Sequence, residues 1–337
     1  MRVLTKILGG FILLGLILAV VGFFMGLEFS SLGAFFSDEE SYGEMITVTH
    51  SEAINELNID VETRDIILHH VEETEMTITY YKHETKDTWV FDGTNEGIYS
   101  FEQDEKVQLF SFWNFKFTPR ELTEVHVYIP TTWVIDLNVE SAVGSIKLEQ
   151  DITVDLLYVE LISHTGSIIL ENANVKSLSL HTDTGGIVVK NVVSEEEIGL
   201  SSNTGSVTLT NITGTAISIY TDTGSAKLSE VSGTGLIVEV GTGKIQVSNS
   251  AFSGHLILDT ATGDIDIYHV TGTSFEMDSA TGDVTFTASD LSLYRYDLRT
   301  TTGDITIDGQ DQGTRHSTTT GSILIKASVD TGDIEIK

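Results

Sequence analysis

Three aspartates that recur at a regular interval are the residues of this sequence whose type and spacing most suggest a binding site. Asp264, Asp283 and Asp304 each follow a glycine directly, at intervals of 19 and 21 residues. A file of carboxylate oxygens can hold Ca²⁺, so the three residues are a candidate cation site. The alternative is a solvated aspartate in a turn, which is the usual role of Asp after Gly. In the next copy Ser322, not an aspartate, follows the glycine. The calcium-binding repeat Gly-Gly-x-Gly-x-Asp is absent from the sequence.

A run of aromatic residues offers a second kind of chemistry. It extends from Trp89 to Trp133, and most of its members lie at alternating positions, where the core residues of a strand belong. We therefore interpret the cluster as a hydrophobic cap over one end of the repeats described below, since an uncovered strand edge invites aggregation. Trp113, beside Asn114, is the candidate exception and a possible platform for a ligand.

The histidines do not form a predicted metal site or catalytic pair. His69 and His70 are adjacent, so on a strand they point to opposite faces and cannot chelate one ion. His164 and His181 lie at different offsets from their glycines, which puts them out of register. The sequence shows no phosphate-binding loop, zinc-binding His pair or Ser/His/Asp set.

Basic residues are too scattered to hold an anionic sugar in a catalytic cleft. The nearest approach to a group is Arg295, Arg299 and Arg315. The chain has no Cys, which excludes disulfides, thiolate metal sites and Cys catalysis. We predict no catalytic residue and no cofactor apart from the candidate Ca²⁺.

A single repeat must position these residues. From Gly144 onward a glycine recurs with a period of about 19–20 residues, and Thr precedes it in ten of eleven copies. Such a period is typical of a solenoid. The glycines are Gly144, Gly166, Gly185, Gly205, Gly224, Gly243, Gly263, Gly282, Gly303, Gly321 and Gly332.

Apolar residues flank each glycine at fixed offsets. Residues two and four after it are apolar in all copies, and residues seven and five before it are apolar in the first nine. Each copy therefore predicts two short strands joined at a tight Thr-Gly corner. Stacked copies bury continuous ladders, so we predict an all-β, right-handed parallel β-solenoid. A twisted antiparallel meander is the alternative. The predicted inward residues include Ile187, Leu209, Ile219, Ile245, Leu258 and Ile305.

The N-terminus predicts a membrane anchor. Residues 7–27 carry no charge and are long enough to cross a bilayer as a helix. Residues 1–6 hold two cations, so the positive-inside rule places them in the cytoplasm and the bulk of the chain outside the cell. A cleaved signal peptide is the alternative. An acidic linker over 28–45, a capping β region over 46–140 and the solenoid over 141–337 complete the predicted order.

The charge of the chain limits its partners. A net charge of −32 opposes nucleic-acid binding, because phosphates would be repelled. It favours solubility and attraction to cations or basic partners. We expect a monomeric ectodomain whose partners are the membrane, through residues 7–27, and a cell-envelope component or another protein.

The last copies depart from the pattern. The glycine spacing falls to 18 and then 11, and Thr314 and His316 replace the apolar pair expected before Gly321. We expect the final strands, up to Lys337, to fold over as an irregular turn that closes the end of the array.

The motifs as a whole resemble a known family. The Thr-Gly-(Asp/Ser)-Ile-x-(Ile/Leu) copies, the Val-Tyr-Ile-Pro strand ending at Pro130 and the leading apolar segment resemble the bacterial "putative adhesin" β-strand-repeat family, which includes LiaG-like cell-envelope proteins. The resemblance implies a cell-surface β-solenoid of unknown function and brings no catalytic residues. The resulting prediction is a non-enzymatic, membrane-anchored extracellular protein that serves adhesion, binding or the envelope-stress response. The alternative is a carbohydrate-active lyase or hydrolase on a β-solenoid.

Overall fold

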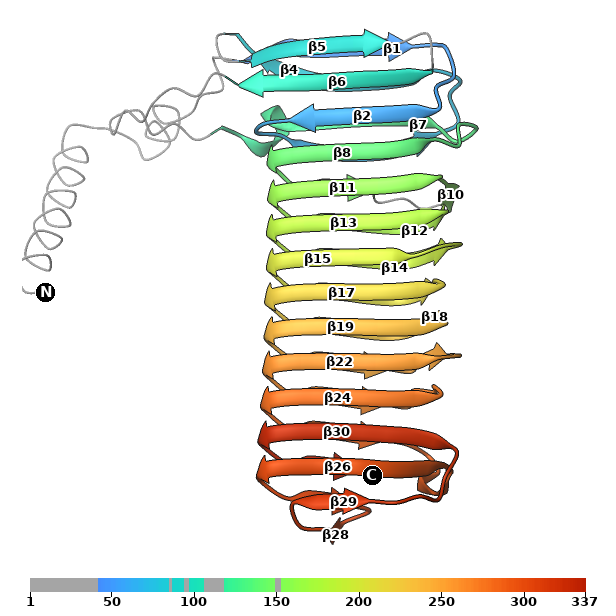
Figure 1. The fold of residues 1–337 in the computed structure, drawn as a ribbon. Coiled ribbons are helices and arrows are strands. Elements are labelled where there is room, and N and C mark those ends of the chain that lie inside the picture. The colour runs from blue at the N-terminus through green and yellow to red at the C-terminus, as the bar shows by residue number, and fades with distance from the viewer. Residues whose placement is uncertain (1–41, 85–86, 94–96, 106–117, 149–152) are drawn as a thin grey trace, which may run out of the picture.

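The computed structural model describes residues 42–84, 87–93, 97–105, 118–148 and 153–337 as an all-β rod (Figure 1). Two short 3₁₀ turns, η2 (Arg120–Leu122) and η3 (Leu291–Leu293), interrupt the strands. Within the described ranges no helix is long and apolar enough to cross a membrane. The predicted anchor at 7–27 lies outside these ranges.

Two sheets face each other along the rod. The front sheet holds one strand of every coil and is completed by shorter strands at its ends. In spatial order it contains β5 (Asp87–Gly93), β6 (Ile98–Glu105), β2 (Glu56–Val61), β8 (Asp136–Val143), β11 (Tyr158–Thr165), β13 (Ser177–Thr184), β15 (Ile198–Thr204), β17 (Ala216–Thr223), β19 (Gly235–Thr242), β22 (His255–Thr262), β24 (Ser274–Thr281), β30 (Ile323–Thr331), β26 (Tyr294–Thr302) and β29 (Arg315–Ser317).

The back sheet holds the second strand of every coil. In spatial order it contains β1 (Tyr42–His50), β4 (Met76–His83), β7 (Glu124–Pro130), β3 (Asp65–Val71), β9 (Ile146–Leu148), β12 (Ile168–Val175), β14 (Ile187–Ser194), β16 (Val207–Thr213), β18 (Ala226–Gly233), β20 (Ile245–Ser248), β23 (Ile265–Tyr268), β25 (Val284–Thr287), β31 (Ile334–Ile336), β27 (Ile305–Ile307) and β28 (Gln310–Asp311). Short strands β10 (Val154–Asp155) and β21 (Ala251–Phe252) pair with β12 and β18.

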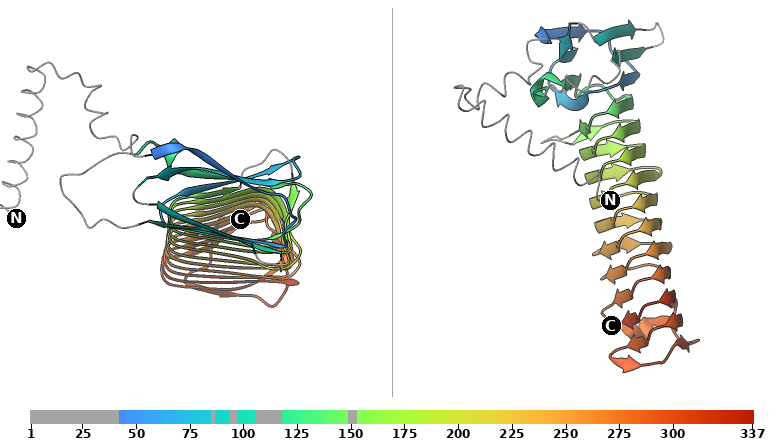
Figure 2. Two further views of the ribbon diagram at one scale, coloured as in Figure 1. Left: turned by 90° about the horizontal axis from the view of Figure 1, so that it is seen from above. Right: turned by 90° about the vertical axis from the view of Figure 1, so that its left-hand side faces the viewer.

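Successive coils pair in parallel with equivalent residues side by side. Ile187 of β14 pairs with Val207 of β16, and Ile219 of β17 pairs with Val238 of β19. Viewed down the axis, the coils superimpose as one flattened ring (Figure 2). The parallel solenoid is thus confirmed, and the antiparallel meander is excluded for the coils from β8 to β25.

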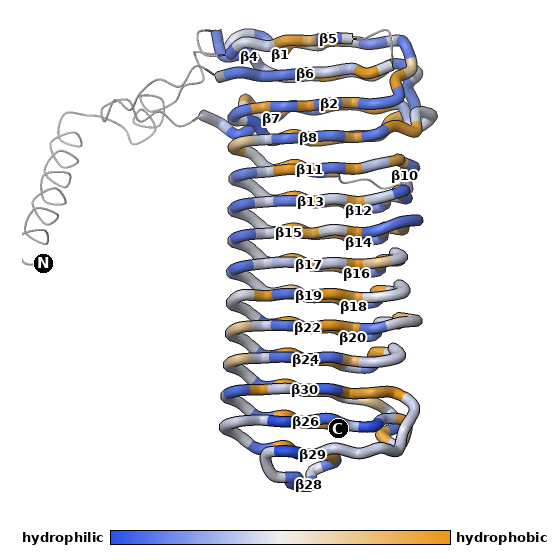
Figure 3. Tube along the Cα trace, in the orientation of Figure 1, coloured by the Kyte–Doolittle hydropathy of each residue, from blue (hydrophilic) through white to orange (hydrophobic). Residues whose placement is uncertain are grey.

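The core is a set of apolar ladders between the two sheets. Apolar and polar residues alternate along each strand (Figure 3), so one face is buried and the other exposed. All six of the named inward positions are buried, and Ile245 is 0% exposed. Of the positions between them, Lys227 is exposed, whereas Gln246 and Thr306 are half-buried.

Buried hydroxyls support the corners from inside. In eight coils a Ser or Thr three residues before the corner donates to the backbone carbonyl at the corner of the neighbouring coil, over 2.8–3.2 Å. These hydroxyls are removed from water, and each is satisfied by that bond. They belong to Ser141, Ser163, Thr182, Ser202, Thr221, Thr260, Ser279 and Thr300.

Both ends of the rod depart from sequence order. At one end β6 and β7 lie outside β2 and β3, and antiparallel β4, β5 and β1 complete the edge. At the other end β30 and β31 lie between β24–β25 and β26–β27. The expectation that the final strands close the array is therefore wrong. The terminal edge is instead covered by antiparallel β28 and β29, from residues 310–317.

Candidate functional site on the front sheet

The outer face of the front sheet collects polar side chains from successive coils. Leu57, Ile59, Leu137 and Val139 fill the core, so their neighbours along β2 and β8 must face outward. Parallel pairing then places outward residues of equal offset in rows across the coils. A row is therefore read from residues about 20 positions apart in the sequence.

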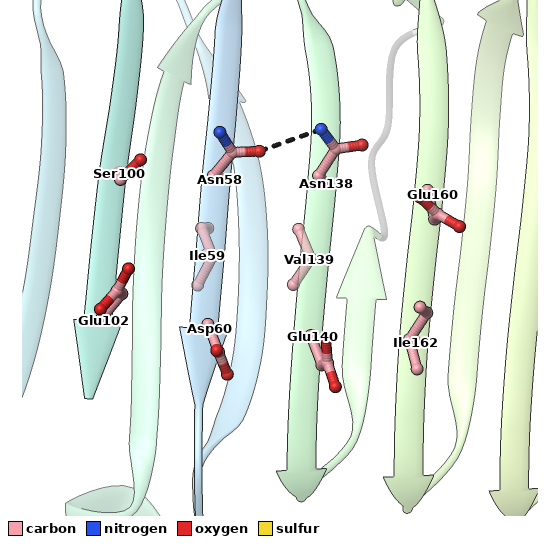
Figure 4. Close-up of a pocket in the computed structure, with 10 residues that line it drawn as sticks. All are labelled: Asn58, Ile59, Asp60, Ser100, Glu102, Asn138, Val139, Glu140, Glu160 and Ile162. Atoms are coloured by element: carbon pink, nitrogen blue, oxygen red, sulfur yellow. Dashed lines mark hydrogen bonds between the residues drawn. The ribbon is translucent and has the colours of Figure 1, made fainter. Parts of the chain in front are cut away.

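A shallow hollow lies across β6, β2, β8 and β11 (Figure 4). Asn138 Nδ2 donates to Asn58 Oδ1 over 2.9 Å at one side of it. Asp60 lies between its register partners Glu102 and Glu140. Burial, together with these carboxylates, raises the pKa of Asp60 above its usual value. The arrangement favours cations and repels anions.

His164 links this acidic row to the next coils. Its Nδ1 lies 2.6 Å from Asp183 Oδ2, and its Nε2 lies 3.2 Å from Glu140 Oε1. The hydrogen bond to Asp183 raises the pKa of His164, and the same bond lowers the pKa of the Asp183 carboxyl. The His164 imidazole therefore bridges three adjacent strands.

A Ser–His–Asp chain continues from Asp183. His181 Nε2 lies 3.2 Å from Asp183 Oδ1, and His181 Nδ1 lies 2.6 Å from Ser201 Oγ. Sequence analysis saw no such set, because it placed His164 and His181 out of register with each other. Both histidines in fact contact Asp183. Asp183 and His164 each lie two residues before the corner glycine of their coil, so they are neighbours across strands, and Asp183 lies on the same strand as His181.

Among the described residues, this Ser–His–Asp set is not joined by the other parts of a hydrolase site. A catalytic serine needs donors aimed at the oxyanion as well as a base. The strand around Ser201 is paired on both sides, with β13 and β17, so its backbone N–H groups belong to the ladder. Asn203 Nδ2, a nearby side-chain donor, is used by Asp183 over 2.8 Å. The arrangement orients a serine hydroxyl without preparing it for acyl transfer.

A second hollow adjoins Ser201 in the middle of the rod. Ser179, Gly199 and Ser218 are register neighbours on three adjacent strands, and because they are small they leave a depression in the sheet surface. Tyr220 stands beside it, 43% exposed, and its hydroxyl donates to Asp222. Ile237, 44% exposed, closes the row. Small polar groups beside an aromatic ring thus form an open surface that encloses nothing.

The predicted aspartate file has a structural role. Asp283 N donates to Asp264 Oδ1, Asp333 N to Asp283 Oδ1, and Asp304 N to Asp333 Oδ1, over 2.8–3.1 Å. Asp333 enters the file because β31 lies between β25 and β27. Serines accept the same bond at earlier corners; for example, Ser167 N donates to Ser145 Oγ over 3.2 Å.

At one end of this aspartate file, a lysine side chain already lies beside the carboxylates. Lys244 Nζ contacts Asp266 and lies 3.7 Å from Asp264 Oδ2. Throughout the described ranges no three acidic or histidine side chains are arranged to hold a metal ion. Calcium binding by Asp264, Asp283 and Asp304 stays a prediction. Trp113, the predicted ligand platform, lies outside the described residues.

The β1–β7 region contains a buried ion pair that sequence analysis missed. Arg64 contacts Asp87, and both side chains are almost fully buried. Arg64 Nη1 also donates to the Leu122 carbonyl over 2.8 Å, and the Asp87 carboxylate accepts from His83 N over 2.8 Å. Arg64 occupies the corner position that glycine holds in later coils, next to Asp65. The pair therefore ties the first coil to the strands that cover it.

The aromatic side chains described in this region pack together over the end of the core. The ring centroids of Trp89 and Phe91 each lie 5.0 Å from that of Phe101, which is fully buried. Tyr80 lies 4.1 Å from Trp89 by the same measure. These rings contact one another as core residues do.

These features define a class, the parallel β-solenoid repeat proteins with broad polar faces. The chain belongs to the Toastrack DUF4097 family, whose model matches residues 54–269 and 231–337. The resemblance to the "putative adhesin" β-strand-repeat family is confirmed. No curated protein sequence matches the chain.

Several solved structures are similar to this chain at low identity. A "putative adhesin" from Parabacteroides distasonis has 10% identity and a TM-score of 0.47, covering 87% of this chain and 97% of that one. A "putative adhesin" from Parabacteroides merdae has 13% identity and a TM-score of 0.45, covering 88% and 97%. A "putative lipid binding protein" from Parabacteroides distasonis has 13% identity and a TM-score of 0.45, covering 88% and 98%.

Proposed function

We propose that this protein is a non-enzymatic binding module of the cell surface, serving adhesion or the envelope-stress response. Residues 7–27 anchor it, residues 1–6 lie in the cytoplasm, and the rod is extracellular, with right-handed coils and a monomeric ectodomain. The observation that carries the proposal is the form of the two hollows. Both are lined by residues of flat, paired strands of the front sheet. Such surfaces contact a partner broadly and do not exclude water from a reacting group.

Surface exposure is tested on intact cells that produce the full chain. Added protease should remove the rod from intact cells, because everything after residue 28 lies outside. A cytoplasmic protein serves as the control for lysis. If the rod resists protease on intact cells but is cut after lysis, the proposed orientation is wrong.

The hydrolase alternative has one observation in its favour, the Ser201–His181–Asp183 chain. A fluorophosphonate probe, which labels activated serines, tests it on the full chain. We expect no more labelling of the natural chain than of Ser201→Ala, because the backbone N–H groups around Ser201 belong to the sheet and Asn203 Nδ2 is used by Asp183. Stoichiometric labelling that Ser201→Ala and His181→Ala both abolish would establish an enzyme.

A further inference from the structure

Three arginines belong to β26 and β29, the strands at the end of the rod opposite β1 (Figure 1). Arg295 and Arg299 lie on β26, where they alternate with buried Tyr296 and Leu298 and so face outward. Antiparallel pairing of β26 with β29 places Arg315 directly opposite Arg299. All three side chains are exposed on the same face of the front sheet.

None of these arginines has an ionic partner in the described part of the chain, where no carboxylate oxygen lies within 4.0 Å of their nitrogens. The polar contact of the group is from Arg299 Nε to Ser328 Oγ, 2.9 Å. Several lysines of the coils do have such a partner, for example Lys190, which contacts Glu171 over 2.6 Å. Because the chain has 50 acidic and 18 basic residues, unpaired arginines are unexpected on statistical grounds alone.

The placement also costs stability. Like charges directly opposite each other on neighbouring strands repel, so Arg299 and Arg315 destabilise the pairing of β26 with β29. Lys326 of β30 adds a further cation near Arg299, although its own ammonium contacts Glu276. Inside the protein the group makes one hydrogen bond, from Arg299 to Ser328, and Arg299 also acts to lower the pKa of Asp278 against the larger effect of burial. Most of its hydrogen-bonding capacity is therefore left for a partner from outside.

Asp297 shapes the ligand that this group can accept. It faces outward between Arg295 and Arg299 on β26, and repels an anion placed midway between them. Arg295 and Arg299 are four residues apart, about 13 Å along a strand. The group thus offers two positions for anions, one at Arg295 and one shared by Arg299 and Arg315.

We propose that Arg295, Arg299 and Arg315 bind a polymer that carries repeated phosphate groups. Two guanidinium forks that approach from neighbouring strands suit a tetrahedral phosphate with several free oxygens, whereas one fork satisfies a planar carboxylate. The separate position at Arg295 requires a second phosphate on the same ligand. This inference rests on the proposed surface function and names a ligand class for it.

The acidity of the rest of the rod does not prevent such binding. Charges are screened over about 8 Å at physiological ionic strength. Neighbouring coils are ~4.8 Å apart, so acids only a few coils away have little effect at this end. The nearest charges govern the encounter. They are the three arginines and Lys326 on one side and Asp297, Glu276 and Asp278 on the other, so the local excess is still positive.

Inorganic polyphosphate is the probe, added to the full chain in detergent micelles, with binding followed by calorimetry. We expect micromolar affinity for the natural chain and at least a tenfold loss in the triple variant Arg295→Gln, Arg299→Gln, Arg315→Gln. The matched control replaces Lys82, Lys147 and Lys227 by Gln. It changes the net charge equally, and we expect it to leave the affinity within twofold. Circular dichroism checks that both variants fold.

Each other outcome overturns the proposal. Absence of binding, or an equal loss in both variants, removes the site. Orthophosphate binding as tightly as polyphosphate removes the polymer. Self-association of the natural chain that only the arginine variant abolishes assigns the group to carboxylates of a second copy. Protease exposure on intact cells is read independently, so failure here leaves the surface function standing, whereas failure of exposure removes that function.

Discussion

Each corner glycine lies against the backbone of the neighbouring coil. Gly243 has a φ of +150°, a backbone conformation that residues other than glycine rarely adopt. A Cβ there would lie 1.8 Å from the Gly224 carbonyl oxygen. The glycine therefore answers two requirements, the backbone angle and the close approach of two coils.

Replacement of Gly243 should consequently be severe. We expect Gly243→Ala to lower the free energy of unfolding by about 3 kcal/mol or more, because both coils must move apart. Gly235→Ala in the same coil is the control, since its Cβ would meet the His255 carbonyl oxygen at an ordinary 3.6 Å. Urea denaturation of the two variants measures the difference. Equal stability would show that the corner tolerates a side chain.

His70 gives the region around β3 a dependence on pH. Burial lowers its pKa to about 4, with His69 adding to the effect. The folded state then favours neutral His70, so its contribution is complete above the unfolded pKa of about 6.5 and is lost as pH falls toward 4. The loss amounts to roughly 3 kcal/mol for a shift of this size.

Comparison with a variant separates the effect of His70 on stability from the effects of other groups that titrate in acid. We expect His70→Leu to lose less stability than the natural chain between pH 7 and pH 4.5, measured by urea denaturation at each pH. His255→Leu, at an exposed position, should keep the natural profile. A natural profile in His70→Leu as well would contradict the assignment.

At the scale of strands and coils, the repeat in the sequence predicts the interior of the rod well. Ile245 and its equivalents are inward because alternation and a fixed period both require it. The network of His164, Asp183 and Ser201 was not predictable from local motifs. It depends on which outward residues share a row, and this is known only once coils are stacked in register.

The order of the last coils needed information that spacing alone does not hold. Thr320-Gly321 matches the corner motif, yet the apolar pair that defines a coil, Ile325 and Ala327, precedes Gly332 at offsets of seven and five. That signal identifies β30–β31 as a genuine coil. Its insertion beside β24 is a tertiary preference, because any coil with the same ladder can pair there.

Truncation tests this insertion. A chain that ends at Gly321 lacks β30 and β31, so β24 and β26 both lose the strand that they share. We expect hydrogen–deuterium exchange to rise in β24–β25 and in β26–β27, while β17 and β19 stay protected. If exchange rises only in β26–β27, those strands are merely the frayed end of the rod, and the insertion is wrong.

At the scale of the whole molecule, like charges meet along the front sheet. Glu239, Asp259 and Asp278 are register partners on β19, β22 and β24. Burial, with Glu239 beside it, raises the pKa of Asp259, and burial also raises that of Asp278. The folded rod brings these carboxylates closer together than an unfolded chain does, so their repulsion opposes folding.

Salt should therefore stabilise this protein. Raising NaCl from 0.01 to 0.15 M shortens the screening length from about 30 to about 8 Å, so we expect the Tm to rise. The variant Glu239→Gln, Asp259→Asn, Asp278→Asn should melt higher at low salt and respond less. Calcium chloride at matched ionic strength separates screening from binding. If calcium raises the Tm further and Asp283→Asn abolishes that rise, the aspartate file is a cation site. In the NaCl series, a Tm that falls as salt is added would contradict repulsion as the dominant charge effect.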